Sequence, residues 1–166
     1  GNFSSTQIGA LSTAQVQGLT LVQLNAMSVD KLDAIALTKL TAGQLAGLST
    51  TSIVNLTETQ ISALTSTQIS ILTTAQFGAL TTTEIGNLNT DQAGALTSTQ
   101  VAGLTTTYFS ALSATTGIPS LSTTAIAGIS TEDIYALTAT QGNAFAQTQI
   151  DAMTLAQTQA LIEVVT

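Results

Sequence analysis

The stretch that decides the fold is residues 56–71, which read LTETQISALTSTQISI. It contains an eight-residue pattern twice, and the same pattern, with the consensus Leu-Thr-x-x-Gln-Ile-x-Ala, recurs throughout the chain. Nineteen repeats each start on a large apolar residue, at positions 3, 11, 19, 27, 40, 48, 56, 64, 72, 80, 88, 96, 104, 112, 121, 129, 137, 145 and 153. A fixed short period predicts an array in which each repeat is stabilised by its neighbours.

The polar positions of the repeat predict helix starts. Position two is Ser or Thr in seventeen of the nineteen repeats, the exceptions being Asn89 and Ala146, and position five is Gln in twelve. Ser or Thr followed three residues later by Gln is a capping box, in which each side chain binds a backbone N–H of the first helical turn. The apolar residue before the cap and the one four residues after it, such as Leu64 and Ile69, fit the accompanying hydrophobic staple.

The spacing of the apolar positions separates the possible folds. One continuous helix would rotate by about 80° per repeat, so it would present no straight apolar seam. Strands need inward residues at even spacing, whereas positions one, six and nine are five and three residues apart. We therefore predict an all-α solenoid, a superhelix of very short helices, with small residues at positions seven and eight that let adjacent backbones approach closely. A β-solenoid remains the alternative because the turns are rich in Thr.

The prediction for domain organisation is a single repeat array, residues 1–166, with two interruptions. Residues 35–39 insert five residues after the fourth repeat. Residues 113–120 contain one extra residue and the only proline, Pro119, which we expect to break the helix. Each interruption is either a hinge or subunit contact, or a drifted repeat tolerated in a loop.

The composition excludes many functions. The chain has 166 residues, a net charge of -7 and no His or Cys, so the usual ligands for zinc, copper or haem and the commonest catalytic bases are missing. Its only cations are Lys31 and Lys39, too few to bind a phosphate backbone. No uninterrupted apolar run is long enough to span a membrane. We predict no enzyme activity, no catalytic residue, no metal or other cofactor, no nucleic-acid partner and no membrane insertion.

The ends of the array suggest self-assembly. The first repeat follows the consensus, with Phe3 and Ile8 at its apolar positions, and the last residues are unusually apolar. We predict that these ends join head to tail into a homopolymer, through Phe3, Ile8, Leu161, Ile162, Val164 and Val165. The alternative is that a longer repeat array has been cut at both ends, in which case the chain would not polymerise. The position-five Gln residues are expected to act mainly as caps, and secondarily as a surface ladder that pairs between chains.

Two runs carry a resemblance to a known family. Residues 56–69 and 72–80 resemble the low-complexity Leu-Thr-x-x-Gln-Ile repeats of very large exported bacterial proteins labelled adhesin-like or haem-utilisation-like. The resemblance implies an extracellular, cell-surface or filament-forming protein and carries over no catalytic residue. The expected function is a self-assembling extracellular filament or cell-surface fibre subunit. The alternative is an adhesin stalk or an ice-binding module, which would bind a surface ligand.

Overall fold

The structure, a computed structural model, describes residues 3–166, and these form nineteen α-helices and one 3-10 helix without any strand. The predicted all-α solenoid of short helices is confirmed, and the β-solenoid alternative is wrong because the Ser and Thr residues cap helices. Contacts divide the chain into two compact units, residues 1–80 and 81–166. Each unit is described by itself.

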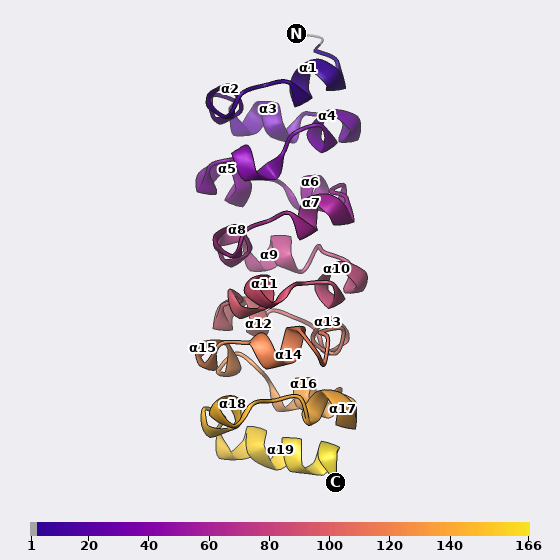
Figure 1. Cartoon of the computed structure of the whole chain (residues 1–166), viewed down its shortest axis with the longest axis vertical. Helices are drawn as coiled ribbons and strands as arrows, with labels where there is room; N and C mark the ends of the chain where they lie inside the picture. Colours follow the sequence, from indigo (N-terminus) through magenta and orange to yellow (C-terminus); the bar gives the residue numbers. More distant parts are fainter. Residues whose placement is uncertain (1–2) are drawn as a thin grey trace. The chain divides into compact units, whose positions relative to one another are not determined.

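Most helices contain only four or five residues. Figure 1 shows them as short coiled ribbons joined by brief connections. The first unit contains α1 (Ser5–Gly9), α2 (Thr13–Gln17), α3 (Leu21–Asn25), α4 (Val29–Asp33), the 3-10 helix η1 (Leu37–Lys39), α5 (Ala42–Ala46), α6 (Thr50–Val54), α7 (Glu58–Ser62), α8 (Ser66–Ile71) and α9 (Thr74–Phe77). The second contains α10 (Thr82–Gly86), α11 (Thr90–Gly94), α12 (Ser98–Ala102), α13 (Thr106–Phe109), α14 (Gly117–Ser120), α15 (Thr123–Ile126), α16 (Thr131–Tyr135), α17 (Ala139–Gly142), α18 (Gln147–Asp151) and α19 (Leu155–Val165).

The capping boxes form as the sequence predicts. At the start of α8, the Thr65 hydroxyl accepts a hydrogen bond from the Gln68 N–H at 3.2 Å, and Gln68 Oε1 accepts one from the Thr65 N–H at 3.1 Å. Asn89 replaces Thr with the same geometry, since its Oδ1 accepts from the Gln92 N–H at 2.9 Å. Ala146 has no oxygen to offer, but its N–H still donates to Gln149 Oε1 at 2.7 Å.

The core consists of the side chains at positions one and six. Leu64 and Ile69, the pair that exemplifies the staple, are both buried, as are the equivalent residues of most repeats. The short helices wind into a coil, and residues about 28 to 31 positions apart lie on successive turns of this coil. Small residues allow these turns to come close together. A Cβ atom on Gly128 would lie 2.1 Å from the carbonyl oxygen of Ser98, which is 30 positions earlier in the chain. Glycine is therefore required at position 128 by close backbone approach.

The position-five Gln residues hold successive turns together, which the sequence analysis did not anticipate. Gln76 Oε1 accepts from the Thr73 N–H, while its Nε2 donates to the carbonyls of Leu45 and Leu48 at 2.9 and 2.7 Å. Gln157 makes the same contacts in the second unit, donating to Ile126 and Ile129 at 2.9 and 2.7 Å. These bonds span 28 to 31 residues. Both Gln side chains are buried, so they do not form the expected surface ladder.

The hydrogen bonds that join one turn to the next form what we call a junction. One junction in the first unit uses Asn25 and Ser52 in place of a position-five Gln. Ser52 occupies position five of its repeat, and its side chain is too short to make the bonds to backbone carbonyls of the preceding turn that Gln makes. Asn25, on α3 of that turn, compensates: its Oδ1 accepts from the Ser49 N–H at 2.8 Å and from the Ser52 hydroxyl at 3.1 Å, while its Nδ2 donates to the Gly47 carbonyl at 3.0 Å. The Ser49 hydroxyl still caps α6 by accepting from the Ser52 N–H at 3.1 Å, so Asn25 supplies the other half of the capping box and the link between turns.

Residues 35–39 form a shortened repeat that keeps its place in the stack. Ile35 and Leu37 are buried, and Lys39 Nζ donates to the Leu11 carbonyl at 2.7 Å, as a position-five Gln would. Gln68 Nε2 donates to the Leu37 carbonyl at 2.9 Å, 31 residues earlier, the same separation as between Gln76 and Leu45. Residues 35–39 thus donate a hydrogen bond to the preceding turn and accept one from the following turn, so this segment is integrated into the coil.

The longer interruption also contains a helix, and the expectation that Pro119 breaks it is wrong. Pro119 is the third residue of α14, where an N–H has no partner within the helix and the fixed φ of proline suits the first turn. The extra residue is accommodated just before α14, where the Ser113 hydroxyl accepts from the N–H groups of Thr115 and Thr116. Ile118 is buried, and its carbonyl accepts from Gln149 Nε2 at 2.8 Å.

Candidate functional site

The first turn of the coil carries three position-five Gln residues whose side-chain NH2 groups make no hydrogen bond within the described residues. Gln7, Gln15 and Gln23 accept hydrogen bonds from the N–H groups of their cap residues at 2.9, 2.8 and 2.8 Å. All three side chains are exposed, and their Nε2 atoms have no hydrogen-bond partner among residues 3–166. The donors that join turns elsewhere are thus available on this face, which we call the N-terminal face.

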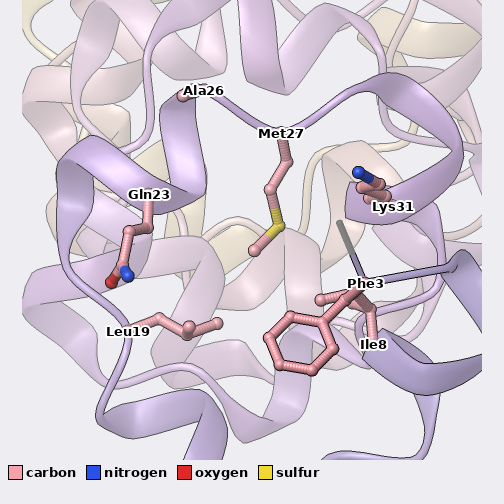
Figure 2. A pocket seen from close by; sticks show the side chains of 7 residues that line it. All are labelled: Phe3, Ile8, Leu19, Gln23, Ala26, Met27 and Lys31. Atoms are coloured by element: carbon pink, nitrogen blue, oxygen red, sulfur yellow. The ribbon is translucent and has the colours of Figure 1, made fainter. Parts of the chain in front are cut away.

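One of these residues, Gln23, lines a pocket of about 290 Å³. Figure 2 shows Phe3, Leu19 and Met27 pointing toward one another around it, with Ile8 next to the Phe3 ring. Gln23 and Lys31 lie on opposite sides in this view and add an amide and an ammonium group to the otherwise apolar lining. The pocket therefore suits an apolar side chain that is accompanied by a hydrogen-bond acceptor or a negative charge.

The structure places both predicted N-terminal assembly residues in this pocket. Phe3 is 55% exposed, whereas Ile8 is buried and belongs to the core. Sequence reasoning missed Leu19, Met27, Gln23 and Lys31, which complete the lining together with Ala26. The signal was present, because these residues stand at positions one and five of the third and fourth repeats, positions that are covered in later turns.

The four predicted C-terminal assembly residues divide between two sides of α19. Leu161 is buried, and atoms of Leu161, Val164 and Val165 occupy the space around Gly142 on α17. Gly142 lacks the apolar side chain usual at position six, and α19 fills that place. Ile162 alone of the four is strongly exposed, at 53%. The C-terminal segment is therefore packed onto its own unit, with one of the four predicted residues presented to solvent.

Glu163 on α19 affects the titration of Tyr135 on α16. The pKa of Tyr135 is raised above 10.0, first because its hydroxyl forms a hydrogen bond with Glu163, then through desolvation and the negative charges of Glu163 and Glu132.

The fold and the stacking contacts define a class: a repeat protein in which short capped helices form a coil, with Gln side chains joining successive turns. The ALTTAQ repeat family matches residues 37–74 and 72–106, which together make up less than half of the chain. These segments contain the capping boxes and the Gln76 junction described above. A comparison with curated proteins found no match. Within the described residues, none of the helices is long and apolar enough to cross a lipid bilayer.

Proposed function

We propose that this chain is a structural protein, a self-assembling subunit of an extracellular filament or cell-surface fibre that grows head to tail as a homopolymer. The observation that carries the proposal is the group of Nε2 donors on the N-terminal face that have no hydrogen-bond partner within residues 3–166. Gln7, Gln15 and Gln23 stand at the repeat position whose Nε2 joins turns at Gln76 and Gln157. A further turn from a second copy, with its helix-end carbonyls, fits this face chemically.

Further support comes from the acceptors at the junctions, which are the same kind of chemical group at different places in the coil. Backbone carbonyls are the acceptors at the Gln44 junction, with Val16 and Leu19, and at the Gln149 junction, with Ile118 and Leu121. Since the acceptors are main-chain groups, binding depends on the geometry of a turn rather than on particular side chains. A contact between different ends of two copies does not close on itself and can propagate. The resemblance to exported repeat proteins supports an extracellular or cell-surface location.

The proposal is tested by removing the free donors without removing the caps. Gln7→Glu, Gln15→Glu and Gln23→Glu, made together, keep a capping acceptor, because Glu84 at the same position accepts from the Thr81 N–H at 2.7 Å. The variant loses the Nε2 donors and places carboxylates against carbonyl oxygens. We expect wild-type chains to form filaments in negative-stain microscopy and large species in sedimentation, and this variant to remain monomeric.

A matched control adds the same charge elsewhere. Thr82→Glu, Thr106→Glu and Gln147→Glu, made together, alter exposed positions of the second unit. We expect this control to assemble like the wild type. Wild-type chains that stay monomeric over a wide concentration range would overturn the proposal, and so would donor-free chains that still form filaments.

A further inference from the structure

The outer face of α19 offers a surface whose chemistry complements the N-terminal pocket. α19 packs against α16 and α17 with Ala160 and Leu161 buried, while Leu155 and Ile162 on the other side are 75% and 53% exposed. Leu155 and Ile162 are seven residues apart, so they lie on the same side of the helix. Glu163 follows Ile162 directly and is exposed as well.

The N-terminal pocket has the matching features in another part of the chain. Its lining by Phe3, Leu19 and Met27 can enclose an aliphatic side chain, and it carries Lys31 on one side (Figure 2). Lys31 is one of only two cations in a chain with net charge -7, so its presence at this opening is a specific electrostatic feature. An apolar side chain next to a carboxylate is the complement of this pocket.

We propose that the pocket binds the outer face of α19 from a second copy of this chain, with Ile162 inserted between Phe3, Leu19 and Met27 and Glu163 opposite Lys31. This inference rests on the proposed self-assembly and names its joint. The contact uses two different surfaces, so each added copy leaves one pocket and one α19 available, and growth can continue. Of the C-terminal residues expected from sequence to form the joint, Ile162 makes the contact, while Leu161, Val164 and Val165 support α19 from inside.

The apolar half of the joint is tested with Ile162→Asp, which changes an exposed residue and leaves the core of α19 intact. The control is Val54→Asp, because Val54 is 63% exposed and lies on neither surface. We expect Ile162→Asp to weaken self-association, measured by analytical ultracentrifugation, more than about tenfold, since it places a desolvated charge in an apolar pocket. Val54→Asp should assemble like the wild type, and an equal loss in both variants would overturn the joint.

The polar half is tested by charge reversal. Lys31→Glu and Glu163→Lys should each weaken association about fivefold at low salt, because each places like charges opposite each other. The double variant, and an equimolar mixture of the two single variants, should associate within about twofold of the wild type, since each contact again pairs opposite charges.

The outcomes separate this inference from the proposed function. Wild-type assembly that responds to the loss of the Gln donors but to neither Ile162→Asp nor the charge reversal would leave the proposed function standing and overturn this joint. A wild-type chain that never assembles would overturn both.

Discussion

The first and second turns of the first unit have the same repeat but differ in what their Gln residues do. Gln15 on the first turn is exposed and serves only as a cap, with an Oε1 contact of 2.8 Å to the Ser12 N–H. Gln44 on the second turn makes the same cap and also donates to the carbonyls of Val16 and Leu19 at 2.9 and 2.8 Å. The difference shows that one residue type has a local role set by its repeat and a second role set by its place in the stack.

The largest expected effect comes from removing a buried junction. Gln76→Ala should lower the free energy of unfolding by about 2–4 kcal/mol, because it removes the cap acceptor and leaves buried carbonyls without their donor. Gln15→Ala removes only an exposed cap contact and should cost about 0.5–1 kcal/mol. Urea denaturation of both variants measures the difference. Equal losses would contradict the second role of the buried Gln.

The substituted junction between Asn25 and Ser52 should show strong coupling. Asn25→Ala should cost about 1–2 kcal/mol, since the Ser49 N–H and the Gly47 carbonyl both lose a partner. Introducing Ser52→Gln into the Asn25→Ala chain should recover most of that loss, because Gln at position 52 supplies the usual capping box and reaches the preceding turn. A double-mutant cycle in urea gives the coupling energy. Simple additivity of the two changes would refute the compensation.

The shortened repeat provides a smaller test. Lys39→Met should destabilise the first unit by about 1 kcal/mol, because the bond to the Leu11 carbonyl is lost while the aliphatic stem is kept. Lys39→Gln should be closer to the wild type, because the amide keeps a donor at the same repeat position. Hydrogen exchange of residues 35–40 follows both variants locally. If Lys39→Gln is as damaging as Lys39→Met, the shortened repeat does not use the Gln type of junction.

The smallest expected effect is a gain in stability. Asp133 occupies position five of its repeat and is buried, and its Oδ2 accepts from the Ser130 N–H at 3.0 Å, but a carboxylate has no N–H to offer the preceding turn. Gln157 reaches the carbonyls at position six of one repeat and position one of the next, and the equivalent carbonyls for a Gln at position 133 are those of Val101 and Leu104. Asp133→Gln should therefore stabilise the second unit by about 0.5–1 kcal/mol, raising its Tm by about 1–4 °C in calorimetry. A lower Tm would show that the longer side chain does not fit.

The candidate site was only partly predictable for a related reason. Phe3 and Ile8 were identified from the repeat itself, and Ile162 from the apolar C-terminal segment. Lys31 and Met27 were missed, because their role at the pocket depends on how the fourth repeat packs beside Phe3 and Leu19, which the spacing within one repeat does not show. The inward placement of Val164 and Val165 was missed as well, since it depends on the space left by Gly142, which is more than 20 residues away in sequence.

What the sequence alone determined is everything that acts within one repeat. Capping boxes such as Thr65 with Gln68 connect residues three apart, so the helix starts, the all-α class and the buried positions one and six follow from local spacing. Only the tertiary structure decided which carbonyl each Gln reaches, because that depends on the number of repeats in a turn. It also decided that residues 35–39 and Pro119 belong to the coil. Contacts that span 28 to 31 residues depend on the accumulated geometry of the intervening helices, which no single repeat encodes.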